Sequence, residues 1–446
     1  MNLHRLLMAR HEAGRPVGVA LVGAGKFGTM FLAQALATRG LHVVAVADLA
    51  PDRARARLAG AGWPAERFAA PTPDAARASG GTWVTDDALA ALSHPAVEVV
   101  VEATGDPRSG VRLCRAAIAA GKHVVMVNVE ADALAGPLLA REAAAAGVVY
   151  SLAWGDQPAL VCEHVDWARS CGLEVVAAGK GTRYHPSYHS STPDTVWDIL
   201  DQYLQIADRA AINPKMFNSF LDGTKSAIEM TAVCNATGLH PQSDGLGFPP
   251  ASRFELAEVC KPRAEGGTLE RAGVTEVVSS IRRDHAPVPH DLALGTYVVF
   301  TAQGDYARRC FGEYRMLPDS SGRYAALYRP THLIGLELGV SIASVALRGE
   351  PTGAPTCFHS DVVATAKRDL KAGEVVDGEG GFCVWGRQVP AARSVSARLL
   401  PLGLAHGVRL RRDVAQGEAL RRDDVDLDPS DDAVRARHAM EAAFAP

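Results

Sequence analysis

The sequence has 446 residues, of which 48% are hydrophobic and 22% charged, and its formal net charge is −4. This composition excludes a disordered chain, and the length predicts about three domains. The acidic balance argues against a nucleic-acid partner, and no apolar stretch approaches the length of a membrane span. The eight cysteines contain no CxxC pair, so we expect reduced thiols in a cytoplasmic protein.

Residues 1–15 have the pattern of a short amphipathic helix, and a strand, a glycine turn, a helix and a second strand follow over residues 17–48. Gly23, Gly25 and Gly28 fill the three places of a GxGxxG motif. The first glycine permits a tight turn, the second lets the backbone approach a pyrophosphate, and the third lets the helix pack closely. We therefore predict a dinucleotide-binding Rossmann fold, with a glycine turn that binds no ligand as the alternative.

The choice between NAD and NADP stays open from the sequence. Asp48 stands twenty residues after Gly28 and suits the ribose hydroxyls of NAD, whereas Arg53 and its neighbours Arg55 and Arg57 could meet a 2′-phosphate or face water. Further apolar strands are expected at 97–103, 121–128 and 148–152, and ligands gather beyond the carboxyl ends of such strands. The expected cofactor contacts are Gly23, Gly25, Lys26, Phe27, Gly28, Asp48, Arg53, Thr104, Gly105, Asn128 and Glu130.

A polar segment at 179–192 follows a predicted strand at 173–178 and contains a lysine, an arginine, two histidines and several hydroxyl side chains. Such a set of donors suits an anionic, oxygen-rich substrate, with Arg183 making a bidentate contact to a phosphate or carboxylate. The alternative is a polar surface loop that caps a helix starting near Asp194. His185 and His189 could ligate a metal, but this indication is weak without a third partner.

A second polar set lies at 213–230. A helix that begins near Gly223 places Lys225 and Glu229 four residues apart on one face, either as an exposed ion pair or as a pair that faces a site. These two residues are candidates to polarise a carbonyl and relay a proton, with Lys180 as the substitute for Lys225. The candidate catalytic residues are thus Lys225, Glu229 and Lys180, and the candidate substrate-binding residues are Arg183, His185, Ser187, Lys215 and Asp222.

The C-terminal region contains an internal repeat, because residues 367–374 (KRDLKAGE) recur as residues 411–418 (RRDVAQGE). Each copy predicts a turn flanked by short strands, and the two copies together predict a small β-rich module. A helix within 330–347 is expected to return to the first domain, and 431–444 reads as a short amphipathic helix.

The Rossmann fingerprint, the strand GKHVVMVN, the segment GKGTRYH and the helix DGTKSAIEM together resemble the homoserine-dehydrogenase-like oxidoreductases that carry a C-terminal SAF domain. Within that group they resemble the deoxyxylulose-phosphate-reductoisomerase-like (DRL) branch. The resemblance implies NAD(P)-dependent chemistry on a substrate held by the middle domain. For that branch it implies NADPH-dependent conversion of 1-deoxy-D-xylulose 5-phosphate to methylerythritol 4-phosphate, a step of isoprenoid precursor synthesis.

One departure from homoserine dehydrogenases matters for the chemistry. Their equivalent strand ends in alanine, asparagine and a catalytic lysine, whereas Val129 stands in the place of that lysine here. Homoserine oxidation would therefore need a cation from elsewhere, such as Lys180, Lys215 or Lys225. The alternatives to a reductoisomerase are a dehydrogenase of a sugar acid or homoserine-like hydroxy acid, and a non-catalytic NAD(P)-sensing or scaffold protein.

The expected fold class is α/β, with a doubly wound parallel Rossmann sheet, an α+β substrate and dimerisation domain, and a β-rich SAF (β-clip) module that binds a ligand or serves as a structural appendage. We expect a homodimer with a small-molecule substrate and no nucleic-acid or membrane partner. A divalent metal is possible but unsupported, with Asp156 and Glu163 as the nearest acids; a helix cap and a surface charge are their alternative roles. The expected domains are an N-terminal helix (1–15), the NAD(P)-binding domain (16–155), the substrate domain (156–330), the returning helix (331–355), the SAF-like module (356–428) and a C-terminal helix (429–446).

Overall fold

The computed structural model describes residues 2–203, 209 and 213–445. The chain divides into two compact units. The first comprises Met1–Leu160 with Leu333–Thr356, and the second comprises Val161–His332 with Cys357–Pro446. Among the described residues, none of the helices has both the length and the apolar character needed to cross a membrane.

The first unit is built on a six-stranded, wholly parallel sheet with the strand order β3-β2-β1-β4-β5-β6. This doubly wound order confirms the predicted Rossmann sheet. Its strands are β1 (Val17–Val22), β2 (Leu41–Ala47), β3 (Trp83–Thr85), β4 (Val99–Glu102), β5 (His123–Met126) and β6 (Tyr150–Leu152). Its helices are α1 (Leu3–Glu12), α2 (Lys26–Ala35), α3 (Pro51–Gly60), α4 (Pro73–Ser79), α5 (Ala88–Ser93), α6 (Pro107–Ala119), α7 (Val129–Ala145) and α14 (Gly339–Arg348).

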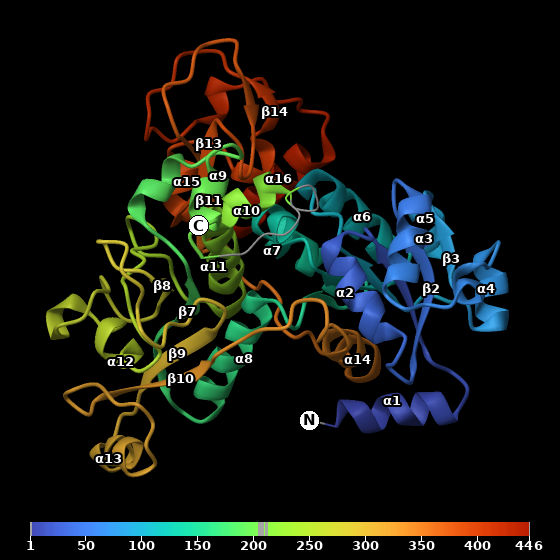
Figure 1. Cartoon of the computed structure of the whole chain (residues 1–446), viewed down its shortest axis with the longest axis horizontal. Coiled ribbons are helices and arrows are strands. Elements are labelled where there is room, and N and C mark those ends of the chain that lie inside the picture. Colours follow the sequence, from blue (N-terminus) through green and yellow to red (C-terminus); the bar gives the residue numbers. More distant parts are fainter. Residues whose placement is uncertain (1, 204–208, 210–212, 446) are drawn as a thin grey trace. The chain divides into compact units, whose positions relative to one another are not determined.

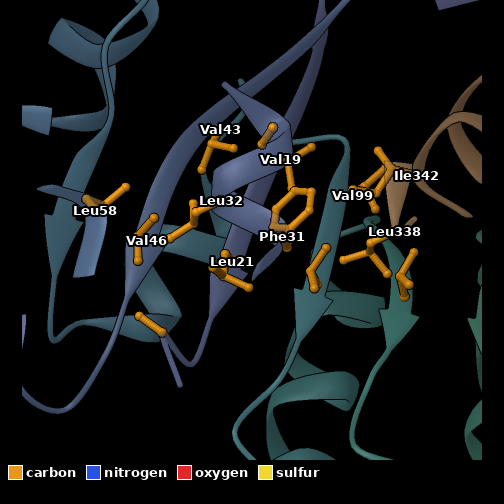
Figure 2. Close-up of a cluster of buried hydrophobic side chains, with 14 of the residues drawn as sticks. Val19, Leu21, Phe31, Leu32, Val43, Val46, Leu58, Val99, Leu338 and Ile342 are labelled. Carbon is orange, nitrogen blue, oxygen red and sulfur yellow. The ribbon is translucent and has the colours of Figure 1, made fainter. Parts of the chain in front are cut away.

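The core of the first unit lies where α2 and the returning segment pack on the sheet. Phe31 and Leu32 point from α2 toward β1 and β2, and Leu338 and Ile342 lie beside β4 (Figure 2). All four side chains are almost completely buried. Removing a buried phenylalanine such as Phe31 costs about 3–5 kcal/mol, so this packing fixes the glycine turn that leads into α2.

The second unit contains a four-stranded sheet in the order β10-β9-β7-β8, in which only β7 and β8 run parallel. Its strands are β7 (Glu174–Thr182), β8 (Val274–Ser279), β9 (Thr296–Thr301) and β10 (Tyr324–Arg329). The helices are α8 (Gln157–Ser170), α9 (Val196–Leu200), α10 (Pro214–Leu221), α11 (Thr224–Thr237), α12 (Leu256–Val259) and α13 (Asp305–Glu313). Helices α8 and α11 pack on one face of the sheet through a shared apolar cluster.

The C-terminal part of the second unit is the predicted β-rich module, drawn in red beside α11 in Figure 1. Its two antiparallel strand pairs join β11 (Ser360–Ala366) to β13 (Val384–Pro390) and β12 (Val375–Asp377) to β14 (His406–Arg409). The helices α15 (Ala391–Ser396) and α16 (Asp432–Phe444) complete it.

The sequence repeat appears in this module as an approximate two-fold arrangement. Leu370 and Val414 occupy equivalent places and exchange both backbone hydrogen bonds, at 2.8 and 3.0 Å. An arginine in each copy pairs with that copy's final glutamate at 2.7 Å. The two copies therefore stabilise each other, as the repeat predicted.

The structure corrects the boundary of the polar segment that was predicted as a loop over 179–192. Strand β7 continues to Thr182, so Lys180 lies within a sheet. The reason is close backbone approach: a Cβ atom at Gly179 would lie 1.8 Å from the carbonyl oxygen of Glu276, and one at Gly181 would lie 1.9 Å from that of Leu292. These glycines serve strand packing, whereas the prediction ended the strand at residue 178 and began a polar loop at Gly179.

Candidate functional site

The glycine turn after β1 has the shape that a dinucleotide phosphate requires. Gly23 has a φ of 97°, and a Cβ there would lie 2.5 Å from the carbonyl oxygen of Ala103. A Cβ at Gly28 would lie 2.5 Å from the oxygen of Gly23, whereas a Cβ at Gly25 would meet nothing within 4 Å. The middle glycine therefore borders open space at the start of α2, where the pyrophosphate of NAD(P) fits.

Asp48 is held at the end of β2 in the place expected for ribose recognition. Its carboxylate accepts hydrogen bonds from the backbone N–H of Ala24 and of Ala50, both at 2.9 Å, and from Arg53 at 3.1 Å. The Asp48 side chain is 9% exposed and that of Arg53 is 61% exposed. The carboxylate is thus fixed in position, while the arginine is accessible to a 2′-phosphate. Lys26 and Phe27 begin α2 beside this turn.

Asn128 organises the expected nicotinamide edge. Its side-chain oxygen accepts from the N–H of Ala131 at 3.1 Å and so caps α7, while its amide nitrogen donates to Thr104 Oγ1 at 3.3 Å and to the carbonyl of Asp106 at 2.9 Å. Glu102 accepts from the N–H of Thr104 at 3.1 Å, and burial raises the pKa of Glu102 to about 7. The edge is therefore rigid before any cofactor binds.

The two other predicted cofactor residues at this edge also lie at the ends of the parallel strands. Gly105 follows Thr104 with a φ of 73°, and Glu130 lies in the first turn of α7. Val129, in the position where homoserine dehydrogenases have lysine, is 2% exposed. No cation at position 129 therefore serves this edge.

The second unit contains a buried ion pair between two of the predicted catalytic residues. Lys180 Nζ on β7 contacts the carboxylate of Glu229 on α11, and the two side chains are 4% and 3% exposed. Lys225, the partner first considered for Glu229, lies one turn earlier on the same helix and is half-buried. A buried charged pair is expensive to desolvate, which makes this place a candidate reaction site.

A histidine that the sequence analysis did not select lies in the same layer. Thr296 is directly opposite Lys180 in the β7–β9 register, and its hydroxyl lies 3.0 Å from Nε2 of His164 on α8. Burial lowers the pKa of His164 to about 4, so the ring is neutral at pH 7. The sequence around His164 predicts a helix and gives no sign of a functional histidine. Its contact with Thr296, 132 residues away, depends on the register of β9 in the sheet.

The predicted substrate residues Asp222 and Lys215 have contacts to the C-terminal module instead. Asp222 is fully buried and pairs with Lys367 at 2.8 Å. Lys215 Nζ donates to the carbonyl of Asp377. In this structure both residues connect the start of α11 and helix α10 to the SAF-like region, so a structural role accounts for them.

The remaining predicted substrate residues form a basic group after β7. The guanidinium of Arg183 lies 4.3 Å from the ring centre of Tyr203. His185 stacks on His285 with ring centres 3.9 Å apart, and its Nδ1 lies 2.7 Å from the hydroxyl of Ser187. Three of the predicted residues therefore lie together with a histidine from the loop after β8.

The acids considered for a metal site have other surroundings. Asp156 is buried and accepts from the N–H of Gln157 at 2.9 Å at the start of α8, and Glu163 is exposed on that helix. Within residues 2–203, 209 and 213–445, no group of three or more His, Cys, Asp or Glu side chains is arranged to hold a metal ion.

Comparison with known proteins defines the class. A model described as an oxidoreductase family with an NAD-binding Rossmann fold matches residues 17–126. A model of the catalytic domain of the oxidoreductase DRL matches residues 155–338. The chain is therefore an NAD(P)-dependent oxidoreductase. More particularly, it is a DRL-like oxidoreductase with an SAF domain, whose model matches residues 361–426.

Solved structures with similar folds are distant. A probable dehydrogenase from Thermotoga maritima is 12% identical, with 75% of this chain and 90% of that chain covered and a TM-score of 0.37. A putative myo-inositol dehydrogenase from Sinorhizobium meliloti is 14% identical, with the same coverages and a TM-score of 0.38. An inositol dehydrogenase homolog complexed with NAD+ from Azotobacter vinelandii is 20% identical over 41% of this chain and 47% of that chain, with a TM-score of 0.28. A search of curated sequences gave no significant match. Likenesses at this level do not identify a substrate.

Proposed function

We propose that this oxidoreductase acts on a small phosphorylated, sugar-like substrate, and most concretely that it converts 1-deoxy-D-xylulose 5-phosphate to methylerythritol 4-phosphate with NADPH. The observation that carries the proposal is the buried Lys180–Glu229 pair inside the segment that matches the DRL catalytic domain. An ammonium and a carboxylate in contact provide both an acid and a base in a place from which bulk water is excluded.

The proposed reaction needs both of these groups. A hydroxyl of the ketose phosphate would lose a proton while a carbon–carbon bond migrates to the ketone carbon, and the ketone oxygen would take up a proton, which gives a branched aldehyde phosphate. When bound, NADPH would supply the hydride for the aldehyde carbon, and the aldehyde oxygen would take a proton, so that NADPH and one proton would be consumed and NADP+ formed. We assign removal of the hydroxyl proton to Glu229. We assign polarisation and protonation of the carbonyl oxygen to Lys180.

Lys180 takes the role first considered for Lys225 because Lys180 contacts Glu229 and is almost completely buried. Thr296 and His164 are positioning residues in this scheme. The neutral His164 ring holds the Thr296 hydroxyl next to Lys180 in the sheet, without adding a second positive charge beside the ammonium.

The basic group after β7 supports an anionic substrate. The guanidinium of Arg183 stacks on the ring of Tyr203 through one face. Its N–H groups, which lie in the guanidinium plane, can then make a bidentate contact with an anion. His185 and Ser187 lie two and four positions after Arg183, where the ring Nε2 donates to the carbonyl of Arg283 and Nδ1 accepts from Ser187. Arg183 is therefore the donor that would bind a phosphate monoester.

A second candidate function is favoured by the same arginine. A guanidinium fork binds a carboxylate as well as a phosphate, so a dehydrogenase of a sugar acid or another hydroxy acid would use Arg183 in the same way. The two candidates are separated by assaying purified protein with NADPH against deoxyxylulose phosphate, and with NADP+ and NAD+ against sugar acids, each with and without a chelator. Turnover of sugar acids alone would favour the second candidate.

A further inference from the structure

A cavity of about 240 Å³ lies in the second unit on the side of α11 that is remote from the ion pair. Gly223 and Ala227 of α11 border the cavity, together with His189 and residues of β13. Lys225 and Glu229 follow Gly223 and Ala227 by two positions each, which is roughly 200° around the helix. The cavity and the Lys180–Glu229 pair are therefore on opposite sides of α11.

Three rings border this cavity and form one wall, those of His189, Phe248 and Trp385, and the ring of Tyr184 supports them. Tyr184 stacks on Phe248 and His189 stacks on Trp385, with ring centres 3.7 Å apart in both pairs. Tyr184 Oη joins the pairs through a 2.7 Å hydrogen bond to Nε2 of His189. Trp385 comes from the SAF-like region, so the wall is completed by that module.

The protonation state of His189 follows from its partners. Its Nδ1 lies 2.7 Å from the carbonyl oxygen of Asp222, which can only accept, so Nδ1 carries the proton and Nε2 accepts from Tyr184. Burial lowers the pKa of His189, which keeps the ring neutral. His189 therefore presents a rigid, uncharged ring face.

The wall is held in a strained conformation. Phe248 has a φ of 49°, which a side-chain-bearing residue rarely adopts. The buried carboxylate of Glu276 accepts from the N–H of Phe248 at 3.2 Å, and the Arg283 guanidinium donates to the carbonyl oxygen of Phe248 at 3.0 Å. Strain maintained by several hydrogen bonds is typical of ligand sites.

The opposite edge of the cavity is polar. Arg387 on β13 donates to the backbone carbonyl of Asp244 at 3.0 Å, and the Asp244 side chain is 95% exposed. Gln388, which is 1% exposed, also borders the cavity. Its amide nitrogen donates to the hydroxyl of Ser360 at 3.1 Å, and its amide oxygen has no hydrogen-bond partner within the described part of the chain.

We propose that this cavity is a second small-molecule site, specific for one unphosphorylated monosaccharide or polyol of similar size. The C–H groups of such a molecule pack on uncharged rings, and its hydroxyl groups pair with an arginine and a carboxylate. A volume of about 240 Å³ is too small for a nucleotide. A phosphate is disfavoured because His189 is neutral and Asp244 stands beside Arg387. The SAF-like module thus senses a sugar-like ligand at a distance from the reaction site.

Saturation-transfer NMR and calorimetry on the full chain test the proposal, with a panel of unphosphorylated pentoses, hexoses and their polyols as probes and inorganic phosphate as comparator. We expect saturable binding of at least one sugar or polyol and none of phosphate. Trp385→Ala and the rim variants Arg387→Gln and Asp244→Asn should each weaken that binding at least tenfold. The rim variants lie outside the apolar core and keep the test informative if Trp385→Ala does not fold.

Two control variants separate this site from its surroundings. Phe382→Ala removes an exposed aromatic ring of the same module, and Lys225→Ala changes the opposite side of α11; neither should alter sugar binding. The proposal is overturned if no sugar or polyol binds, if phosphate binds in their place, or if the rim variants bind as tightly as the unaltered protein. It is also overturned if Lys225→Ala abolishes binding, because the sugar would then occupy the reaction site. Absence of deoxyxylulose phosphate turnover leaves these outcomes unchanged.

Discussion

At the scale of single residues, Asp48, which we propose for ribose recognition, also supports the glycine turn. Because its carboxylate already accepts from two backbone N–H groups, its orientation does not depend on a bound cofactor. Its negative charge repels a 2′-phosphate, and Arg53 offsets that repulsion. We expect the balance between these two residues to set the preference for NAD or NADP.

We expect Asp48→Ala to weaken NAD binding more than NADP binding, because the change removes the ribose acceptor and also a charge that repels the 2′-phosphate. Arg53→Ala should have the opposite preference. Fluorescence titration with both reduced cofactors measures the ratio of dissociation constants, and Asp52→Ala, at an exposed carboxylate on α3, is the control. Equal losses for NAD and NADP in Asp48→Ala would show that Asp48 does not read the ribose.

Arg183 provides the corresponding test on the substrate side. Arg183→Ala should lower kcat/KM by a factor of ~10 to 100, the scale of a charge-assisted bidentate contact, while cofactor affinity stays constant. Arg309→Ala, at an exposed arginine of α13, removes the same charge elsewhere in the second unit and should leave kcat/KM unchanged. Steady-state kinetics of the two variants with a phosphorylated substrate decide the matter. A normal kcat/KM for Arg183→Ala would remove this residue from the substrate site.

At the scale of elements, the contact between β7 and α11 carries the proposed chemistry. Replacing one member of a buried pair leaves an uncompensated charge, which costs about 3–5 kcal/mol, whereas replacing both with apolar residues costs less. We therefore expect Lys180→Met and Glu229→Gln to be destabilised, and the double variant Lys180→Met/Glu229→Leu to be partly restored in stability. All three should lose kcat by a factor of ~100 or more, as expected for loss of acid–base catalysis.

The Lys261–Asp319 pair provides a matched control. It is as deeply buried in the same unit, with the two atoms 2.9 Å apart, and it lies outside the proposed site. Lys261→Met/Asp319→Leu should change stability in urea unfolding but leave kcat unaffected. A stable Lys180→Met/Glu229→Leu variant with full kcat would make the Lys180–Glu229 pair structural only.

The elements also show how far the sequence alone reaches. The Rossmann sheet was predictable because its strands are nearly continuous apolar runs and the three glycines act within a few residues of one another. The repeat of the C-terminal module was equally visible as similar residues at a fixed spacing. Local signals of this kind need no knowledge of distant parts of the chain.

The reaction-site pair was only partly predictable. Lys180 and Glu229 could be selected as chemical candidates, but their contact joins residues 49 apart and depends on strand and helix packing. Gly179 and Gly181 suggested a loop because their close approach to other backbone segments is a tertiary feature. For the same reason Asp222 was taken as a substrate residue, whereas its buried partner Lys367 lies in the C-terminal module.

At the scale of the whole molecule, buried carboxyl groups link stability to pH. Burial raises the pKa of Asp132 to about 7, and the Tyr150 hydroxyl donates to its Oδ1 at 2.7 Å. The folded state therefore retains a proton that the unfolded chain releases above about pH 4. The resulting stability is full at acidic pH and is lost as the pH rises through about 7.

Asp132→Asn should remove this contribution. We expect the unfolding free energy of the unaltered protein to fall by an extra ~2 kcal/mol between pH 5.5 and 8 relative to the variant. Urea unfolding at several pH values measures the difference. Asp194→Asn, at an exposed carboxylate, is the control and should show the same pH dependence of the unfolding free energy as the unaltered protein. An identical pH dependence in Asp132→Asn would show that this carboxyl group does not hold the proton.

The most direct measurement is oxidation of NADPH by the purified protein in the presence of 1-deoxy-D-xylulose 5-phosphate, with and without a chelator, and with the product identified by NMR. We predict stoichiometric formation of methylerythritol 4-phosphate and NADP+, lost in Lys180→Met and retained in Lys261→Met/Asp319→Leu. No NADPH oxidation under either condition, from a folded protein that binds NADPH, would contradict the reductoisomerase proposal and leave the hydroxy-acid dehydrogenase as the better account.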